Sequence, residues 1–265
     1  MNKKISIVLA AIAVTILLTS CASSVKFKSL SGRDLTLSGT LYKPDGNGPF
    51  PAVVLFPRCN GVCEWDHSWA SRLKSWGYAA LIVDRFGPRN IVDACKGQDP
   101  IGSVDRIKDA HSAKSYLAGL PFIDSKRIAV MGWSYGGGDV LFAVDPNLWG
   151  ILRSNEATSL SPANTDPFRA AIAFYPYCHR RLENLNAPLL VLIGEKDNWK
   201  PGMAEYCTRN IPTEGKSRYE TIVKVYPGVY HCFDCSGVKL AGRYDHGATS
   251  DSIEQVRNFL YKHMK

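Results

Sequence analysis

The chain has 265 residues, of which 45% are hydrophobic and 21% are charged. This composition excludes a disordered protein, and the length is that of one domain with a sizeable core. The formal net charge of +8 is interpreted as a solvated basic surface, with an anionic surface or acidic substrates as the alternative, and no basic run is dense enough to indicate nucleic-acid binding.

The N-terminus predicts an export signal. Lys3 and Lys4 precede an apolar stretch over residues 5–18, which is too short to span a bilayer comfortably and has the pattern of a signal peptide. The sequence Leu-Thr-Ser-Cys, ending at Cys21, resembles the bacterial lipobox, in which the cysteine is lipidated and becomes the mature N-terminus. We therefore expect a lipoprotein signal peptide over residues 1–20, with ordinary cleavage beside an incidental cysteine as the alternative.

The residues that follow predict where the protein is held. Ala22, with no aspartate at this position, resembles the signal that sorts bacterial lipoproteins to the outer membrane. We expect residues 21–24 to be the lipidated cysteine and a short tether, and residues 25–265 to be a single domain. At about 3.5 Å per extended residue, this tether keeps the domain close to the membrane. The expected location is the periplasmic face of the bacterial outer membrane, with the anchor at Cys21.

Export also decides how the other cysteines are interpreted, because an oxidising compartment permits disulfides. They allow at most three disulfides and one free thiol, and the sequence does not fix the pairing. A zinc site through His231, Cys232 and Cys235 is a disfavoured alternative, because the spacing lacks a second pair of ligands. The cysteines concerned are Cys59, Cys63, Cys95, Cys178, Cys207, Cys232 and Cys235.

Apolar patterns predict strands in the first third of the chain. Residues 25–44 alternate, which predicts one or two antiparallel edge strands with a turn at Ser31-Gly32. Residues 52–56 form a continuous apolar run, as expected of a central strand buried on both faces. A further strand is predicted over residues 79–83.

Helix signals lie between and after these strands. Asp66 is placed to cap a helix that ends at Gly77. A second helix is predicted over residues 103–118 and a final amphipathic helix over residues 251–263. His111 lies near the apolar stripe of the second helix, so we interpret it as a packed core histidine rather than a catalyst.

The remaining strands are predicted over residues 127–131, 170–175, 189–193 and 219–226. Residues 146–166 show no clean period and are interpreted as a surface excursion that could form a lid. Buried strands that alternate with helices predict an α/β fold: a mostly parallel central sheet, helices on both faces and antiparallel strands at the N-terminal edge. Active sites in such sheets lie at the carboxyl ends of the strands.

The sequence Gly132-Trp133-Ser134-Tyr135-Gly136 stands between a predicted strand and a predicted helix. A serine on a tight strand-to-helix turn needs small residues on both sides, and the turn exposes its hydroxyl above the sheet. The N-terminus of the following helix adds positive charge where an oxyanion would form. We therefore interpret Ser134 as a nucleophile.

A serine hydroxyl needs a base to take its proton, and the base needs an acid to fix its tautomer. Asp197 follows the strand over residues 189–193, and His231 follows the strand over residues 219–226. The order serine, acid, histidine is that of α/β-hydrolases. We predict the triad Ser134–Asp197–His231, with Glu195 as the rival acid.

Two backbone N–H groups must stabilise the oxyanion. One is predicted at Tyr135, the residue after the nucleophile, and the other at Arg58 or Cys59 in the loop after the first central strand. No metal or organic cofactor is expected for this chemistry.

Several motifs together resemble one known family. They are Phe56-Pro57-Arg58-Cys59-Asn60-Gly61, Trp76-Gly77-Tyr78, Val83-Asp84-Arg85-Phe86-Gly87-Pro88-Arg89, Gly132-Trp133-Ser134-Tyr135-Gly136-Gly137, Phe174-Tyr175-Pro176 and Tyr226-Pro227-Gly228-Val229-Tyr230-His231. The chain resembles the dienelactone hydrolase family of α/β-hydrolases from about Leu35 to Leu260. This resemblance implies an α/β-hydrolase fold and hydrolysis of esters or lactones.

The chain departs from this family at three places. The founding members have a cysteine nucleophile, where this chain has Ser134. They also have a glutamate in the loop that here contains Arg58, and two arginines that hold the substrate carboxylate. Arg85 or Arg89 could match the first arginine, whereas Cys235 stands near the place of the second. A serine carboxylesterase on the same scaffold fits these departures better than a true dienelactone hydrolase.

The substrate pocket is expected near the catalytic loops. Its candidate residues are Trp133, Tyr135, Trp199, Arg58, Arg85 and Arg89. The expected activity is cleavage of small esters or lactones through an acyl-enzyme on Ser134. A serine peptidase or amidase of the same fold, and a non-catalytic lipoprotein that binds a partner, are the alternatives.

Overall fold

The computed structural model describes residues 22–31, 34–96, 100–145, 147, 166–178, 180–183, 185–213, 217–235 and 244–265. The predicted signal peptide, Cys21 and nearly all of the predicted lid over residues 146–166 lie outside this part of the chain. In the described part, none of the helices has the length and apolar character needed to cross a bilayer.

An eight-stranded sheet forms the centre of the structure, in the order β1-β2-β4-β3-β5-β6-β7-β8. β1 and β2 pair antiparallel with each other, and β2 pairs antiparallel with β4; every other pairing is parallel. The strands are β1 (Ser23–Lys28), β2 (Thr36–Tyr42), β3 (Phe50–Phe56), β4 (Ala79–Asp84), β5 (Ile123–Trp133), β6 (Ala171–Phe174), β7 (Leu189–Lys196) and β8 (Thr221–Tyr230). The predicted α/β architecture with antiparallel N-terminal edge strands is confirmed.

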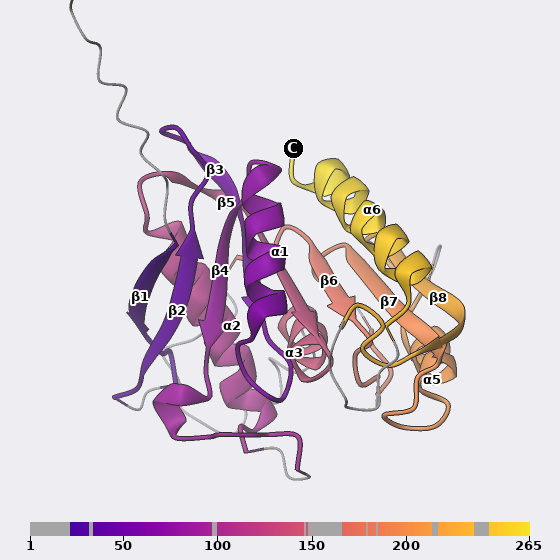
Figure 1. The fold of residues 1–265 in the computed structure, drawn as a ribbon. Coiled ribbons are helices and arrows are strands. Elements are labelled where there is room, and N and C mark those ends of the chain that lie inside the picture. Colours follow the sequence, from indigo (N-terminus) through magenta and orange to yellow (C-terminus); the bar gives the residue numbers. More distant parts are fainter. Residues whose placement is uncertain are drawn as a thin grey trace, which may run out of the picture.

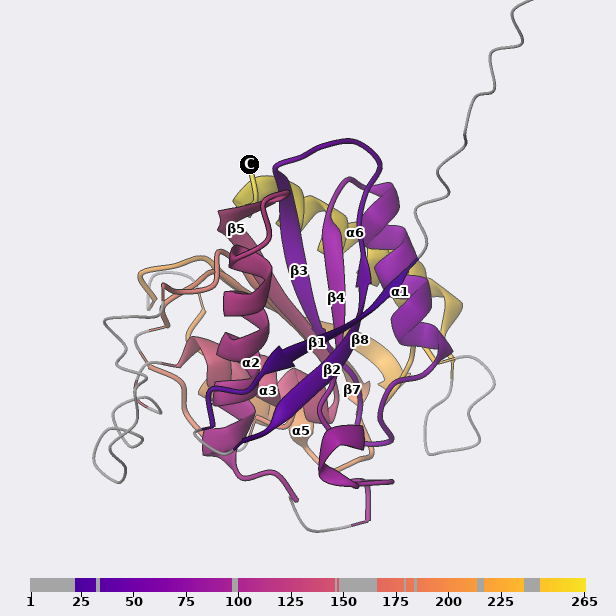
Figure 2. The ribbon, with the colours of Figure 1, turned by 90° about the vertical axis from the view of Figure 1, so that its left-hand side faces the viewer.

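Helices lie on both faces of this sheet. α1 and α6 cover one face, and α2 and α3 cover the other (Figures 1 and 2). The helices are α1 (Glu64–Ser75), α2 (Ser103–Ala118), α3 (Tyr135–Val144), α5 (Met203–Asn210) and α6 (His246–His263), with a short 3-10 helix, η1 (Gly87–Arg89). α1 connects β3 to the parallel β4, α3 connects β5 to β6, and α5 connects β7 to β8, as in other sheets built from right-handed crossovers.

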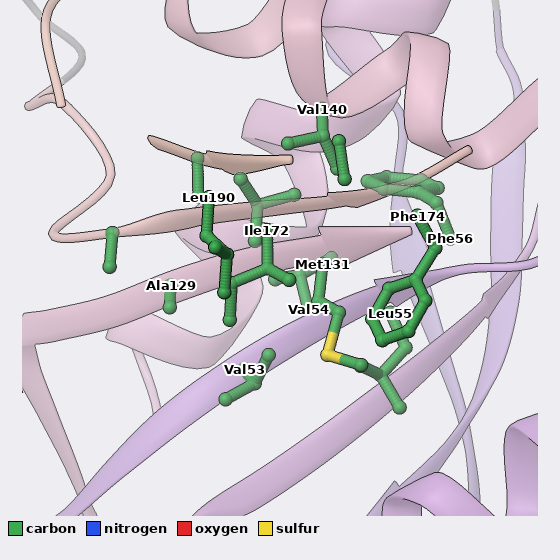
Figure 3. Packing of buried hydrophobic residues seen from close by; sticks show 14 of the residues in the cluster. Val53, Val54, Leu55, Phe56, Ala129, Met131, Val140, Ile172, Phe174 and Leu190 are labelled. Carbon is green, nitrogen blue, oxygen red and sulfur yellow. The ribbon is translucent and has the colours of Figure 1, made fainter. Parts of the chain in front are cut away.

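The continuous apolar runs form the core between the sheet and its helices. Val53, Leu55 and Phe56 of β3 pack beside Met131 of β5 and Ile172 of β6, and all are fully buried (Figure 3). Because both faces of these strands are covered, their sequences carry no polar alternation. This rigid layer fixes the positions of the strand ends.

The register brings those ends to one edge. Phe56, the last residue of β3, pairs with Gly132 of β5, and Trp133 of β5 pairs with Phe174 of β6. Since the strands are parallel, the loops that follow β3, β5, β6, β7 and β8 all leave from the same edge of the sheet.

Several predicted boundaries are wrong: β1 begins at Ser23, inside the predicted tether, and β5 begins at Ile123, four residues before the predicted strand. Asp66 is not the N-cap of α1, because the helix begins at Glu64 with Cys63 at the N-cap; Asp66 stands at N3 of a capping box, where its carboxylate accepts a hydrogen bond from the Cys63 N–H (2.8 Å). β8 continues through Pro227-Gly228, which was predicted as a turn, because Gly228 takes a φ of +72° within the strand. α6 begins at His246, five residues before the predicted start, where Asp245 caps it.

The cysteines form three disulfides within the described residues: Cys59–Cys95, Cys178–Cys207 and Cys232–Cys235. Cys63 is the free cysteine of this part of the chain. Each disulfide lies in loops or helices that follow the carboxyl ends of strands. The predicted maximum of three disulfides is therefore reached.

His111 lies in the core, as predicted. Its ring packs against that of Phe168 (centroids 5.3 Å apart), and only 2% of the residue is exposed. Burial, with a smaller contribution from nearby Lys114, lowers the pKa of His111 to about 3. The ring is therefore neutral in the folded protein throughout the neutral and mildly acidic range.

This burial predicts a loss of stability in acid. The unfolded chain binds a proton at His111 below about pH 6.5, whereas the folded chain does so only near pH 3. Unfolding is thus favoured as the pH falls through this window, and this residue should lower the free energy of unfolding by about 1.5–2 kcal/mol between pH 6.5 and pH 5. Urea titrations of the wild type and of His111→Gln measure the difference. Parallel pH dependence in the two proteins would contradict the assignment.

Candidate active site

Ser134 occupies a strained turn between β5 and α3. Its backbone has φ 53° and ψ −111°, a conformation that L-residues rarely adopt. A Cβ at Gly132 would collide with the backbone of Gly136, and a Cβ at Gly136 would collide with the backbone oxygens of Phe56 and Pro57. The two glycines are therefore required by close backbone approach, and the turn has the geometry that the sequence predicts.

The three predicted triad side chains lie together at the carboxyl edge of the sheet. The His231 Nε2 is 3.0 Å from the Ser134 Oγ, and the His231 Nδ1 is 2.8 Å from the Asp197 Oδ2. All three residues are buried. Asp197 follows β7 and His231 follows β8, so neighbouring parallel strands deliver the acid and the base to the serine. This arrangement can deprotonate a hydroxyl, with the carboxylate holding the imidazole in the tautomer whose Nε2 accepts the proton.

Glu195, the rival acid, is engaged elsewhere. Its Oε2 accepts a hydrogen bond from the Gly228 N–H (2.7 Å), within the segment of β8 that was predicted to be a turn. Asp197 also accepts a hydrogen bond from the Trp199 N–H (3.1 Å) through its other carboxylate oxygen. Both oxygens of Asp197 are thus used to hold the carboxylate toward His231.

The two loops predicted to donate to the oxyanion lie against each other. The close approach of Gly136 to Phe56 and Pro57 brings the start of α3 beside the loop that contains Arg58 and Cys59. Cys59 and Tyr135 both line the cavity at Ser134. The Cys59–Cys95 disulfide joins this loop to the segment that follows β4 and η1.

The cavity that opens at Ser134 and His231 has a volume of about 660 Å³, enough for a small organic substrate. Trp199 lines it as predicted, with 44% of the residue exposed and its ring stacked on that of His231 (centroids 5.6 Å apart). The aromatic side chains of the lining come from Tyr135, Phe142, Tyr175, Tyr177 and Trp199.

Four other pocket predictions are wrong, because Arg58, Trp133, Arg85 and Arg89 are not among the residues that line the cavity. Trp133 is fully buried and packs between Trp69 and Phe174, because its side chain points from β5 into the core. Arg85 is buried in an ion pair, and Arg89 donates two hydrogen bonds of 2.9 Å to Asp109.

Arg85 is part of a cluster of buried charged residues that lies next to the turn at Ser134. Asp139, on the second turn of α3, forms ion pairs with Arg85 and Arg106, and all three residues are buried. Arg106 also donates to the Tyr135 carbonyl oxygen (2.7 Å) and lines the cavity. Burial, and then the neighbouring Arg106 charge, lower the pKa of Arg85 to about 9. Arg106 is the member of this cluster that lines the cavity, so it places a cationic side chain on this side.

The zinc alternative is contradicted by the cysteine pairing. In the described part of the chain, Cys232, Asp234 and Cys235 form the group whose ligand atoms approach within 4.8 Å of one another. Both sulfur atoms are joined in the Cys232–Cys235 disulfide, so neither is a thiolate that could bind the metal. His231 turns both ring nitrogens to Ser134 and Asp197.

Sequence reasoning missed Arg106, Tyr175 and Asp234. Arg106 stands on the cavity side of α2, which only the packing of α2 against α3 reveals. Tyr175 directly follows β6, so its place at the carboxyl edge was available as a signal. Asp234 lies three residues after His231, inside the loop closed by the Cys232–Cys235 disulfide.

Two protein families match parts of the chain. Residues 156–264 match the dienelactone hydrolase family, and residues 68–159 match the prolyl oligopeptidase family. Both matches overlap the region in which the sequence motifs are found. Together they extend from α1 to the end of α6.

Two of the curated relatives are named as a lactonase and a thiohydrolase. The chain is 26% identical over 208 residues to a probable 2-oxo-3-(5-oxofuran-2-ylidene)propanoate lactonase of Bradyrhizobium sp, which covers 73% of this chain and 77% of the lactonase. It is 33% identical over 132 residues to the thiohydrolase apmlB of Arthrinium phaeospermum, which covers 48% of this chain and 40% of that protein. The chain thus spans less than half the length of the thiohydrolase.

Solved structures share the fold. The dienelactone hydrolase-like promiscuous phosphotriesterase P91 from metagenomic libraries has a TM-score of 0.68 at 19% identity and covers 92% of this chain and 99% of its own. Esterase 2 of Thermogutta terrifontis has a TM-score of 0.62 at 20% identity and covers 91% and 94%. The chain therefore shares its fold with dienelactone hydrolase-like and esterase structures, and its second half matches the dienelactone hydrolase family.

Proposed function

We propose that this protein is an exported serine hydrolase that cleaves small carboxylic esters or lactones through an acyl-enzyme on Ser134. The observation that carries the proposal is the chain of hydrogen bonds from Ser134 through His231 to Asp197, which begins at the floor of a cavity of about 660 Å³. The lactonase and esterase names of the relatives support the same substrate class.

Catalysis proceeds by two acyl transfers. The Ser134 Oγ attacks the substrate carbonyl carbon while its proton passes to the His231 Nε2, and Asp197 stabilises the imidazolium through Nδ1–H. The tetrahedral intermediate collapses when His231 returns the proton to the leaving alkoxide. Water then attacks the ester on Ser134, with His231 again taking the proton and returning it to the Ser134 oxygen.

The oxyanion of each intermediate would be stabilised by the backbone N–H of Tyr135 and that of Arg58 or Cys59. The N-terminal end of α3 and the positive cluster of Arg85 and Arg106 add favourable potential at the same place. Such fixed donors stabilise charge that develops in the transition state and cost no reorganisation.

The protein is proposed to be held at the membrane through a lipid on Cys21, on the periplasmic face of the outer membrane. The support is the lipobox-like sequence and the short distance along the chain from Cys21 to β1, which begins at Ser23. Such an anchor would keep the catalytic domain next to the lipid surface.

The match of residues 68–159 to the prolyl oligopeptidase family favours a second candidate, a serine peptidase or amidase. It would use the same three side chains, so the two activities differ only in the leaving group. The third possibility, a non-catalytic binding lipoprotein, would leave the triad geometry without a use.

Ser134→Ala should abolish hydrolysis, because no other group replaces the nucleophile. We expect kcat/KM for nitrophenyl esters from acetate to octanoate to fall by at least about 10³-fold. Ser75→Ala, an exposed serine at the end of α1, is the matched control and should retain activity. Wild-type turnover equal to that of Ser134→Ala would favour the binding protein. Faster cleavage of peptide anilides than of esters by the wild type would favour the peptidase.

The two candidate acids give opposite predictions. Asp197→Asn should lower kcat by about 10⁴-fold, because an amide favours the wrong imidazole tautomer. Glu195→Gln, which changes a carboxylate two residues away, should leave kcat within a few-fold of the wild type. Stopped-flow or steady-state ester assays of both variants measure this. A larger loss in Glu195→Gln than in Asp197→Asn would overturn the assignment.

Cys21→Ser tests the anchor. The wild-type full chain, expressed in a Gram-negative host supplied with labelled palmitate, should carry the label and sediment with the outer membrane. The variant should carry none and appear in the soluble periplasmic fraction. Cys63→Ser, which changes the free cysteine, is the control and should keep the label. Equal labelling of Cys21→Ser and the wild type would exclude lipidation at this residue.

A further inference from the structure

A buried network joins the loop after β3 to the loop that carries His231. Arg58 donates from Nε and Nη2 to the Tyr175 hydroxyl (3.1 and 2.8 Å) and from Nη2 to the Asp234 Oδ1 (3.1 Å). The Tyr175 hydroxyl in turn donates to the Asp234 Oδ1 (2.5 Å). We call these three residues the clamp.

The clamp is shielded from solvent. Arg58, Tyr175 and Asp234 are 6%, 1% and 3% exposed. Burial acts to lower the pKa of Arg58, but Tyr175, Asp234 and Asp66 together raise it above its ordinary value, so the guanidinium stays charged. Hydrogen bonds among buried charged groups are strong and directional, because the surrounding dielectric is low. The clamp thus fixes the loops that follow β3, β6 and β8 relative to one another.

The position of the clamp relates it to the catalytic atoms. Arg58 lies in the loop proposed to supply the second oxyanion amide, and Tyr175 packs its ring edge-on against the His231 ring (centroids 4.7 Å apart). Asp234 lies three residues after His231, inside the short loop closed by the Cys232–Cys235 disulfide. The clamp therefore connects the oxyanion loop with the base.

Substrate contact does not account for this network. Tyr175 reaches the cavity, but Arg58 and Asp234 are not among the residues that line it. A guanidinium and a carboxylate buried behind the cavity wall can act on the reaction only through the backbone and the rings that they hold.

We propose that Arg58, Tyr175 and Asp234 are positioning residues that fix the oxyanion amide of the Arg58–Cys59 loop relative to His231 and the Ser134 Oγ. This inference rests on the proposed function. Because the oxyanion forms only after the serine has attacked, the alignment matters in the transition state and little in the bound substrate. Loss of the clamp should therefore lower kcat and leave KM nearly unchanged.

Tyr175→Phe and Asp234→Asn test the clamp with small changes. The first removes one hydroxyl and keeps the ring on His231, and the second keeps the shape of the side chain. Each should lower kcat for a nitrophenyl ester by about 10- to 100-fold, as expected for misplacement of a catalytic group by a fraction of an ångström to about 1 Å. KM should stay within about twofold. Affinity for phenylboronic acid, which mimics the tetrahedral intermediate on serine, should fall by a factor similar to that for kcat.

The double variant Tyr175→Phe/Asp234→Asn should be little worse than either single variant, because the residues act as a unit. Tyr226→Phe is the matched control: it removes another tyrosine–carboxylate hydrogen bond, to Asp251 (2.8 Å), away from the cavity lining. It should keep the kcat of the wild type. If Asp234→Asn fails to fold, Arg58→Lys takes its place in the test. It keeps the positive charge but loses the planar set of donors, and it should show the same decrease in kcat.

Values of kcat within twofold of the wild type in both Tyr175→Phe and Asp234→Asn would overturn the inference. A rise in KM at constant kcat would also overturn it, because that result indicates substrate binding. Failure of the proposed function has a different signature, since the wild type would then hydrolyse esters no faster than Ser134→Ala.

Discussion

The close packing of the turn at Ser134 against the end of β3 is the constraint on which the site depends. Gly136 brings the start of α3 onto the backbone oxygens of Phe56 and Pro57, with no room for a side chain between them. This contact sets the distance between the serine and the loop that contains Arg58. It also forces Ser134 into its strained conformation, which the buried strands on both sides maintain.

Buried ion pairs of Asp139 also stabilise the turn at Ser134. Asp139 binds Arg85 and Arg106, and Arg106 reaches the carbonyl oxygen of Tyr135. A single carboxylate on α3 thus connects the first two turns of the helix to α2 and to the loop that follows β4. Burial of such charges is costly unless they are paired, so the cluster resists any movement that would separate the pairs. Close backbone packing at Gly136 and the ion pairs of Asp139 therefore both fix the turn at Ser134.

The sequence was sufficient for the fold and for the three triad residues because each rests on a strong local pattern. Continuous apolar runs marked the parallel strands, and the residues directly after them were the natural candidates, which led to Ser134, Asp197 and His231. The pocket could not be predicted in this way. Trp133 is next to Ser134 in the chain, but successive side chains on a strand point to opposite faces, so it enters the core.

The pocket predictions for Arg85 and Arg89 were wrong for a related reason. Arg85 and Arg89 follow β4, at the correct edge, and sequence alone does not show that acidic partners on α3 and α2 take up their charge. Arg106 was overlooked because its helix was interpreted only through its apolar stripe. A long side chain reaches its partner across several ångströms, and this reach is set by helix packing that no local pattern encodes.

The disulfides are distributed in a way that concerns the site rather than the core. Cys59–Cys95 closes the oxyanion loop, Cys178–Cys207 joins the loop after β6 to α5, and Cys232–Cys235 closes the loop after His231. All three lie beyond the carboxyl ends of the strands, where backbone segments lack the hydrogen-bonded support of the sheet and open most easily. Cross-links there restrict the loops that must stay aligned for acyl transfer. Since such bonds persist only in an oxidising compartment, the geometry of the proposed catalytic site would depend on the export that the N-terminus predicts.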